Sequence, residues 1–440
     1  MKILYTSLYI SIILTFLSLP TNLKLNLGLV KHMNNNIKRT LSSSIEQASQ
    51  SFKVIMVTGP RQVGKTTILE EMQKGQRSYV TLDDLSQRVS AQEDPASFIE
   101  RLQLPVLIDE VQYAPNLFPY IKMKVDKDKT AGMFWLTGSP QFEMMKNVTE
   151  SLVGRVAILN LQGISLAEEQ GRPEDKPFLP ELELLKQRQN NAKPLKLLEI
   201  YHKIWRGSYP DVVMDDGKNW ERFYDSYVST YIQRDVREYL NIHQTATFHK
   251  FMQIVAARTG QLVNYADMAR DIGLSEVTIK SWIQVLEASG IIYLLQPYFN
   301  NLTKRLIKSP KLYFMDTGLC CYLTKWLTAE VLERGAMSGA MLETYVVSEI
   351  IKSYIHNGRR PPIYFYRDKD KQEVDLLIEQ NGTLYPIEIK KQGTIQNSNF
   401  KGFNFLNNIK LKIGHGCVIC FVDSLIPIAK NVDAVPVSFL

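Results

Sequence analysis

Apolar and polar positions alternate along the chain in a way that separates strands from helices. The run Val54–Val57 is short, apolar and rich in β-branched residues, which is typical of a buried parallel strand. Further apolar runs, each followed by polar or helical sequence, occur at 105–110, 133–136 and 156–161. The pattern predicts an α/β fold with a parallel sheet in the first part of the chain.

After residue 161 the pattern becomes polar. Residues 170–196 are rich in proline and charge and poor in aromatic residues, which predicts a linker or surface segment with some helix. Apolar content resumes at 199–205, and helical periodicity returns from 220 to 240. We interpret residues 166–245 as a linker followed by a small helical lid.

Residues 246–315 have the pattern of a winged helix. Two amphipathic helical segments are followed by Gly273 at a turn and by Ser275 at the start of a third helix. Apolar runs at 291–297 and 311–314 then predict the two strands of a wing.

Nucleic-acid binding by this unit is left open by its residues. The loop between the two wing strands holds Lys304, Arg305 and Lys308, which are suited to DNA phosphates. The third helix, however, exposes Glu276 and Glu287 and has few side chains suited to base edges. A DNA contact and a purely structural packing role are therefore both compatible with the sequence.

The segment after the first strand has the pattern of a phosphate-binding loop. It reads GPRQVGKTT and satisfies G-x-x-x-x-G-K-[ST] between a predicted strand and a predicted helix. Backbone N–H groups and the positive end of the helix attract phosphate oxygens, Lys65 neutralises the β and γ phosphates, and the Thr66 hydroxyl is a Mg²⁺ ligand. We therefore predict ATP and Mg²⁺ as cofactors. The predicted nucleotide-binding residues are Gly59, Pro60, Arg61, Gln62, Val63, Gly64, Lys65, Thr66 and Thr67.

Two carboxylates end the apolar run at 105–110. At the C-terminal edge of a central strand, Asp109 is expected to face the phosphates and to share the Mg²⁺ ion with Thr66. Glu110 is placed to polarise the attacking water. Lys65 and Glu110 are therefore the predicted catalytic residues.

The remaining polar contacts to the γ-phosphate have more than one candidate. The strand at 133–136 ends in TGS, where Thr137 and Ser139 compete for the role. Three arginines are candidates for completing the site, in cis or from a neighbouring copy: Arg61, Arg155 and Arg234. For Arg155 and Arg234, the alternative is an ion pair at the surface.

A β-hairpin is predicted near the C-terminus. The sequence EVDLLIEQNGTLYPIEIK has Asn381-Gly382 between alternating apolar runs, a strong signal for a two-residue turn. Counting outward from the turn places Asp375 opposite Glu388. The expected core face consists of Val374, Leu376, Ile378, Tyr385, Ile387 and Ile389, and the other face of Glu373, Asp375, Glu388 and Lys390.

Facing carboxylates destabilise a sheet by up to about 1 kcal/mol, so a divalent cation between Asp375 and Glu388 is expected. With Lys390, they resemble the metal site of the restriction-endonuclease-like fold, in which the acids hold Mg²⁺ and the lysine orients the hydrolytic water. A preceding helix usually adds a carboxylate, for which Glu343 is the first choice and Glu349 the second. The alternative is a surface hairpin whose acids are solvated.

Composition limits the class of protein. The 440 residues allow roughly three domains of about 150 residues. An apolar fraction of 45% excludes a mainly disordered or fibrous chain, and a net charge of +7 permits a nucleic-acid partner without requiring one. The four cysteines suggest no disulfide framework, which favours a reducing compartment.

Three other features are not expected to contribute chemistry. The apolar leader at 9–19 is too short to span a bilayer, so residues 1–32 are interpreted as lying outside the fold, with translation starting at Met1 or Met33 and no stable membrane association. Cys417 and Cys420 lie in a strand-like run where they face opposite sides, so a zinc site is not expected. The six histidines are scattered.

The order of motifs resembles the AAA-type ATPases of archaea and bacteria that have a C-terminal domain of unknown function. The resemblance covers nearly the whole chain from Met33 and implies a P-loop ATPase of the additional-catalytic-Glu division at 33–165, then a winged helix, and a nuclease-like domain at 316–440. Ser208 and Gln233 depart from the Gly and the acidic residue of that family. The matching segments are GPRQVGKTT, LIDEVQYAPNLF, LTGSPQ, SLVGRV, GSYPDVV, YIQRDV, FMDTGLCCYL, EVDLLIE and IEIKK.

Three functions follow as hypotheses. The first is a cytoplasmic, Mg²⁺-dependent ATPase coupled to a DNA-associated activity. The second is an ATP-regulated nuclease with a second Mg²⁺ or Mn²⁺ held by the set Glu343, Asp375, Glu388 and Lys390. The third is a non-enzymatic switch in which ATP reorganises the winged helix. The sequence allows a homo-oligomer and does not reveal the substrate.

Overall fold

The computed structural model describes most of the chain beyond the leader. The described residues are 37–139, 148, 150–231, 245–298, 309–367, 372–396, 400–403, 406 and 411–440. The apolar leader, Arg234, Gln233 and the basic loop with Lys304, Arg305 and Lys308 lie outside them.

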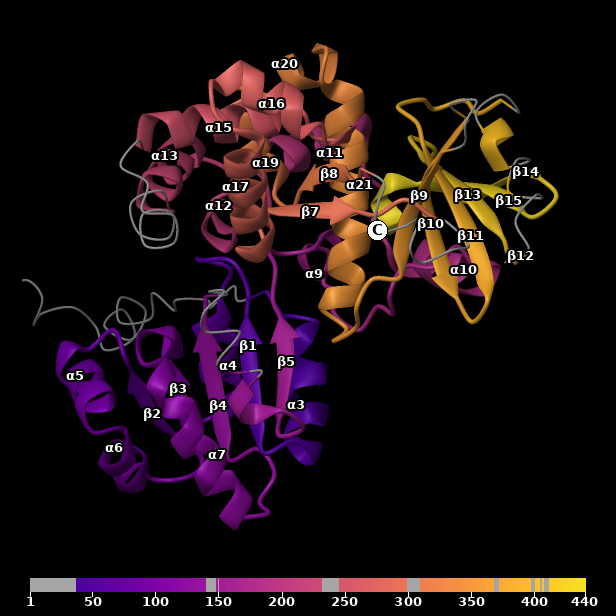
Figure 1. Cartoon of the computed structure of the whole chain (residues 1–440). Helices are drawn as coiled ribbons and strands as arrows, with labels where there is room; N and C mark the ends of the chain where they lie inside the picture. The colour runs from indigo at the N-terminus through magenta and orange to yellow at the C-terminus, as the bar shows by residue number, and fades with distance from the viewer. Residues whose placement is uncertain are drawn as a thin grey trace, which may run out of the picture. The chain divides into compact units, whose positions relative to one another are not determined.

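The first part of the chain forms a five-stranded parallel sheet (Figure 1). The strand order is β2-β3-β4-β1-β5, so β4 lies between the strand that precedes the phosphate loop and the strand that ends in Asp109. The predicted strands are all present. They are β1 Val54–Thr58, β3 Val106–Asp109, β4 Phe134–Gly138 and β5 Val156–Asn160, and the sheet also contains β2 Ser78–Thr81, which was not predicted.

Both faces of this sheet are covered, as its continuous apolar strands predict. Ile55 and Val57 of β1 belong to one apolar cluster, together with residues of α3 and α4. Val54 and Met56 belong to another, together with residues of α6 and α7. The helices of this part are α3 Leu41–Ser51, α4 Lys65–Gln73, α5 Leu85–Glu93, α6 Pro95–Arg101 and α7 Phe118–Lys127.

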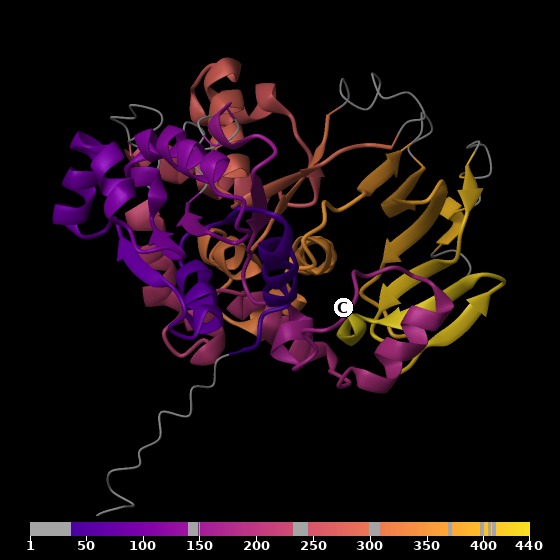
Figure 2. The ribbon, with the colours of Figure 1, turned by 90° about the horizontal axis from the view of Figure 1, so that it is seen from below.

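The segment expected to be a surface linker is partly buried. Phe178 and Leu185 are both fully buried, and the Arg188 guanidinium donates to the carbonyl of Phe439 at 2.6 Å. Figure 2 shows the magenta segment around α10 against the yellow C-terminal strands. The apolar residues that make these contacts are too few and too widely spaced among prolines and charges to give a periodic signal. The helices after β5 are α9 Leu166–Glu169, α10 Leu182–Asn191, α11 Leu197–Arg206, α12 Pro210–Met214 and α13 Trp220–Tyr231.

Three helices and a small antiparallel sheet follow. The predicted turn and cap are present, since Gly273 adopts a left-handed conformation and the Ser275 side chain accepts from the Thr278 N–H. The sheet has the order β6-β8-β7, with Ile292 paired to Phe314. The elements are α15 Thr245–Ala257, β6 Gln261–Leu262, α16 Tyr265–Ile272, α17 Glu276–Ala288, β7 Ile292–Leu295 and β8 Lys311–Phe314. We call these elements the three-helix unit.

The last part of the chain is a mixed sheet preceded by helices. Its strand order is β14-β15-β13-β11-β10-β9, with β12 paired to β11. The helices are α19 Thr317–Leu323, α20 Ala329–Arg334 and α21 Ser338–Ile355. The strands are β9 Ile363–Arg367, β10 Glu373–Gln380, β11 Thr383–Ile389, β12 Lys412–Ile413, β13 Gly416–Cys420, β14 Ile426–Ala429 and β15 Val432–Pro436.

The β10–β11 hairpin has the predicted register, with Gln380 opposite Thr383 and Glu379 opposite Leu384. One part of the prediction is wrong. Val374 packs with the apolar cluster of the face opposite Leu376, because the pairing of β10 with β9 is irregular between Val374 and Leu377. A β-bulge of this kind interrupts the strict alternation on which the prediction depended.

The two cysteines of β13 lie as the strand pattern predicts. Cys417 and Cys420 of β13 belong to apolar clusters on opposite faces of the sheet, and all four cysteines are buried as free thiols. Within the described ranges, no helix combines the length and apolar character needed to cross a bilayer.

Candidate nucleotide site and acidic cluster

The phosphate loop joins β1 to α4. Gly59 has a φ of +146°, and a Cβ there would lie 2.0 Å from the carbonyl oxygen of Leu161, so only glycine fits against the chain that leaves β5. Gln62 and Gly64 also have positive φ values, which turn the loop into the first residue of α4, Lys65. The loop therefore ends at a helix N-terminus, which attracts anions.

Lys65 lies within this loop. It is buried, and its ammonium donates to the carbonyls of Gly59 at 3.1 Å and Pro60 at 2.8 Å. These bonds hold the positive charge at the centre of the loop, where a phosphate oxygen would be neutralised.

Asp109, at the end of β3, is surrounded by hydroxyl groups. Thr66 donates to its Oδ1 at 2.6 Å, and Thr137 of β4 also donates to that oxygen. Tyr79 and Thr81 of β2 reach Oδ2 at 3.3 Å and 3.4 Å. The structure thus brings together the two residues predicted to share Mg²⁺. Tyr79 was not predicted here; desolvation and the Asp109 carboxylate raise its pKa to about 12.

Glu110 has an unusual backbone. Its φ is +58°, and its N–H donates to the Thr137 hydroxyl at 3.1 Å. Gln112 donates to one oxygen of its carboxylate. A left-handed conformation in a residue other than glycine costs roughly 1–3 kcal/mol, so the surrounding contacts must stabilise it. The chain therefore turns at Glu110, directly after the end of β3.

Thr137 and Ser139 can now be distinguished. The Thr137 hydroxyl is already engaged by Asp109 and by the Glu110 backbone. Ser139 is also buried, but its Oγ has no hydrogen-bond partner among the described residues. A buried, unpaired hydroxyl is costly unless a ligand satisfies it, so Ser139 is the better candidate for a phosphate contact.

The candidate arginines differ in position. Arg155 precedes β5 at the edge of the sheet opposite to the phosphate loop and pairs with Asp126, Nε to Oδ1 at 2.5 Å. Five residues of strand at about 3.3 Å each separate it from the loop edge, so it does not reach the site of its own chain. Arg61 lies in the loop, as predicted.

A different arginine supports the loop and was not predicted. Arg39, just before α3, donates to the carbonyls of Val63 at 2.9 Å and Gln162 at 2.7 Å. Its Nε lies 3.2 Å from the carboxylate of Glu168, which is buried. Arg39 thus fastens the phosphate loop to the segment that follows β5.

Glu168 is the centre of a buried network. Its carboxylate accepts the N–H groups of Thr40 at 2.8 Å and Ser165 at 2.9 Å, and it lies 3.2 Å from Nδ1 of His356. Burial alone would raise the pKa of Glu168, but Arg39 and His356 hold it well below its usual range. The Ser165-x-x-Glu168 capping box is a signal that sequence reasoning could have used.

The same segment contacts the C-terminal half of α21. His356 accepts the Gln162 N–H at 3.2 Å, and Glu349 accepts the Leu166 N–H at 2.8 Å. Glu349 also binds the ammonium of Lys352 at 2.8 Å. Glu349, the second choice for the metal site, therefore serves this contact.

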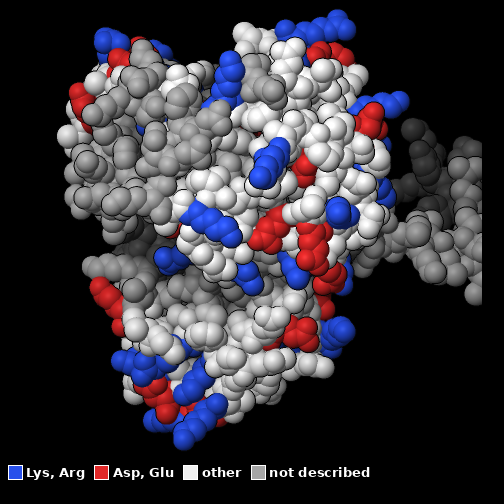
Figure 3. All heavy atoms as spheres, turned by 90° about the vertical axis from the view of Figure 1, so that its right-hand side faces the viewer, with Lys and Arg blue, Asp and Glu red and all other residues white. Residues whose placement is uncertain are grey.

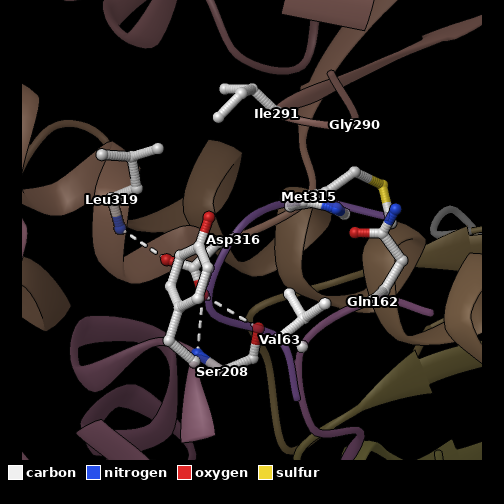
Figure 4. Close-up of a pocket in the computed structure, with 11 residues that line it drawn as sticks. Val63, Gln162, Ser208, Gly290, Ile291, Met315, Asp316 and Leu319 are labelled. Carbon is white, nitrogen blue, oxygen red and sulfur yellow. Dashed lines mark hydrogen bonds between the residues drawn. The ribbon is translucent and has the colours of Figure 1, made fainter. Parts of the chain in front are cut away.

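A narrow cavity lies behind the phosphate loop, with room for roughly one water molecule (Figure 4). Pro60 and Val63 form one wall and the turn after α17 another, where a Cβ on Gly290 would lie 3.0 Å from Pro60. Asp316 lies at the third wall and accepts from the N–H and hydroxyl of Ser208. The loop thus contacts the three-helix unit through a close backbone approach.

The second predicted site is also assembled in space. Asp375 accepts the Ile389 N–H at 2.9 Å, and Lys390 lies 2.6 Å from Glu388 and 3.8 Å from Asp375. Glu343 of α21 also belongs to this group, since burial and the Asp375 carboxylate raise the pKa of Glu343. Burial and the neighbouring Glu388 raise the pKa of Asp375 to about 6.

Two further side chains from β8 enter this cluster and were not predicted. Lys311 lies 3.2 Å from Glu343 and also pairs with Glu373, while Tyr313 donates to Glu343 at 2.6 Å. We call Lys311, Tyr313, Glu343, Glu373, Asp375, Glu388 and Lys390 the acidic cluster. In the part of the chain that the structure describes, no three His, Cys, Asp or Glu side chains are arranged as ligands of one metal ion.

Known families match three consecutive parts of the chain. Residues 51–169 match the family described as "AAA domain". Residues 198–330 and 338–440 match families described as "Domain of unknown function", DUF8612 and DUF4143. The chain therefore contains a P-loop ATPase domain of the AAA type, followed by two domains of unknown function.

Individual relatives are distant. Two are named as uncharacterized proteins, Rv2008c of Mycobacterium tuberculosis and Mb2031c of Mycobacterium bovis; each is 27% identical over 363 residues, which is 81% of this chain and 74% of the relative. Among solved structures, the Walker-type ATPase PABY2304 of Pyrococcus abyssi is 14% identical, with a TM-score of 0.40, over 64% of this chain and 94% of that one. The RuvB Holliday junction branch migration motor of Thermotoga maritima is 18% identical, with a TM-score of 0.28, over 58% and 88%.

Proposed function

We propose that this protein binds ATP with Mg²⁺ between the phosphate loop and the end of β3, and that it hydrolyses the β–γ bond. The observation that supports this most directly is the 2.6 Å contact between the Thr66 hydroxyl and Asp109. Two Mg²⁺ ligands from different elements meet there at the edge of the sheet. Lys65, held by the loop carbonyls, neutralises charge on the phosphates.

Glu110 is the proposed general base. Its carboxylate follows the proposed Mg²⁺ ligand by one residue in the sequence, and its role would be to orient and polarise the attacking water. Ser139, whose hydroxyl is buried and unpaired within the described ranges, would contact the γ-phosphate. The chemistry of these residues fits a magnesium–nucleotide complex. They offer hard oxygen ligands for Mg²⁺ beside an ammonium group for the phosphates.

The test compares phosphate release and ATP binding in the full chain. Lys65→Ala should abolish both, whereas Glu110→Gln should lower phosphate release at least 100-fold and retain ATP binding, since a general base contributes roughly 10²–10⁴-fold. Lys127→Ala, at the exposed end of α7, is the matched control and should behave as the wild type. Unchanged phosphate release in Lys65→Ala would remove the assignment.

The output of the ATPase is proposed to be DNA-associated. Its support is the winged-helix pattern of the three-helix unit, whose α17 is followed by the turn that contacts Pro60. On the face shown in Figure 3, Lys and Arg side chains are interspersed with Asp and Glu rather than gathered into one basic patch. We expect DNA contact to be salt-dependent, because phosphate contacts dominate such binding, and it is tested by ATP hydrolysis with and without duplex DNA.

The nuclease hypothesis is supported by the acidic cluster alone. Its four predicted residues lie together, and one oxygen of Glu388 is buried without a partner among the described residues, as a metal ligand would be. Two ammonium groups, however, already pair with its carboxylates. Plasmid nicking with Mn²⁺ by the wild type but not by Asp375→Asn would establish this second activity.

The switch hypothesis has its own support. The phosphate loop, Arg39, Glu168 and the end of α21 form one continuous set of buried contacts, through which a change at the loop would reach the C-terminal sheet. ATP binding without hydrolysis or nicking would favour this function. The buried free cysteines fit the reducing, ATP-containing cytoplasm proposed for all three functions.

A further inference from the structure

The acidic cluster receives a cation from another part of the chain. Lys311 belongs to β8 of the three-helix unit, whereas Glu343 lies on α21 and Glu373 on β10. The Lys311 ammonium lies 3.2 Å from Glu343 and pairs with Glu373 as well. Its side chain is only 6% exposed, so these contacts replace nearly all of its hydration.

The charges of the cluster do not balance. Four carboxylates face three cations, which leaves one negative charge when all are ionised. The carboxylates are those of Glu343, Glu373, Asp375 and Glu388, and the cations are Lys311, Lys390 and Arg367, whose Nε lies 3.9 Å from Glu373. Burial and the neighbouring carboxylates raise the pKa of Asp375 and of Glu343, as expected for an excess of negative charge.

One oxygen of this cluster is unsatisfied. Glu388 is 8% exposed, and its Oε1 binds Lys390, but its Oε2 is buried and has no hydrogen-bond partner in the described part of the chain. A buried carboxylate oxygen without a partner is costly, and a divalent cation would satisfy it and neutralise the remaining negative charge.

We propose that the Lys311 ammonium is a built-in competitor of a divalent cation in the acidic cluster. The carboxylates that it binds are directed toward Lys311, which explains why no three of the described acidic side chains converge on a metal position. A cation that bound Asp375, Glu388 and Glu343 would displace Lys311 from Glu343. Cation binding would therefore weaken the attachment of β8 to the C-terminal sheet.

This inference requires only that the cluster accepts a divalent cation, which the nuclease hypothesis also needs. It depends on neither ATP hydrolysis nor DNA cleavage. A protein that binds the cation as described here and leaves plasmid intact would refute the nuclease hypothesis and support this one.

The experiment measures Mn²⁺ binding to the nucleotide-free full chain by the loss of the electron paramagnetic resonance signal of free Mn²⁺. Lys311→Met should bind Mn²⁺ at least tenfold more tightly than the wild type, and the gain should disappear in Lys311→Met combined with Asp375→Asn. Lys391→Met is the matched control, because Lys391 pairs with Glu333 outside the cluster. Equal affinity of Lys311→Met and wild type, or a gain that survives Asp375→Asn, would overturn the proposal.

A second measurement uses only the wild type, so it does not depend on whether a variant folds. In the wild type, the acylation of Lys311 by an amine-reactive reagent is followed by mass spectrometry as Mg²⁺ is added, with the exposed Lys325 as the internal reference. Displacement by the cation should raise the labelling of Lys311 several-fold. Labelling that does not change at saturating Mg²⁺ would contradict competition.

Discussion

At the scale of single residues, the nucleotide site depends on hydroxyl groups that hold carboxylates. Thr137 is the clearest case, since its hydroxyl donates to Asp109 and accepts the N–H of Glu110. One side chain from the neighbouring strand thereby holds both Asp109, the proposed Mg²⁺ ligand, and Glu110, the proposed general base. Because Glu110 has a strained backbone, this hydrogen bond also stabilises the conformation that directs its carboxylate.

Thr137→Val tests this arrangement with a side chain of nearly the same shape. It should lower the rate of ATP hydrolysis at least tenfold, because Asp109 and Glu110 lose their common anchor, while ATP binding changes little. Thr230→Val is the control, since Thr230 is exposed on α13 and its hydroxyl donates to the Ser226 carbonyl of the same helix. Full activity in Thr137→Val would show that the contact is not needed for catalysis.

The raised pKa of Asp375 predicts how the stability of the protein depends on pH. Its pKa is raised from 3.8 to about 6, so between these values the folded chain binds more protons than the unfolded chain, and stability falls as the pH rises. At a pH above both values, this shift corresponds to a loss of about 3 kcal/mol in the free energy of unfolding. Asp375→Asn should restore that stability.

The measurement is the Tm of wild type and Asp375→Asn in EDTA from pH 4 to pH 7. The variant should gain in Tm relative to the wild type as the pH rises through this range. A difference that is constant with pH would mean that Asp375 is not buried beside Glu388 as the structure has it.

At the scale of elements, sequence patterns predicted those features whose geometry depends on residues that are neighbours in the sequence. The phosphate loop, the strand before Asp109 and the turn at Asn381-Gly382 are contiguous in sequence, so their geometry follows from residue type and spacing. Arg39 and Lys311 were missed because their partners lie on distant elements. Val374 was assigned to the wrong face because a bulge depends on the pairing with β9, which no pattern within β10 reports.

The short helix α9 shows how one element joins two sites. Its capping residue Glu168 binds Arg39 on one side and His356 on the other, in a fully buried position. Glu168→Gln removes the charge and leaves Arg39 buried without its carboxylate. It should destabilise the protein by about 3–5 kcal/mol, as breaking a buried ion pair does.

Thermal unfolding of Glu168→Gln is compared with that of Glu174→Gln. Glu174 pairs with Lys38, but both side chains are about 70% exposed, with values of 73% and 70%, so its loss should cost less than about 1 kcal/mol. Equal effects of the two substitutions would show that the buried network contributes no more than a surface pair.

At the scale of the whole molecule, α21 connects the two sites. Its 18 residues span about 27 Å, with Glu343 in the acidic cluster and Glu349 and Lys352 at the segment that follows β5. A helix of this kind transmits displacement as a rigid body. We therefore expect nucleotide binding to be detected along α21 as well as at the loop.

Hydrogen exchange tests this connection. A non-hydrolysable ATP analogue should slow exchange in the phosphate loop, at 161–168 and in the last two turns of α21. His356→Ala, which removes the acceptor of the Gln162 N–H, should abolish the effect on α21 and retain it at the loop. Protection confined to the loop in the wild type would argue against coupling through this helix.

The central claim is that Thr66 and Asp109 share a magnesium ion beside the bound triphosphate, and the Mg²⁺ dependence of phosphate release in Asp109→Asn tests it most directly. The amide keeps the shape and the hydrogen bond from Thr66 but loses the negative charge. Half-maximal activity of Asp109→Asn should require at least tenfold more Mg²⁺ than that of the wild type, with a lower maximal rate. The same Mg²⁺ dependence and the same rate in both proteins would contradict it.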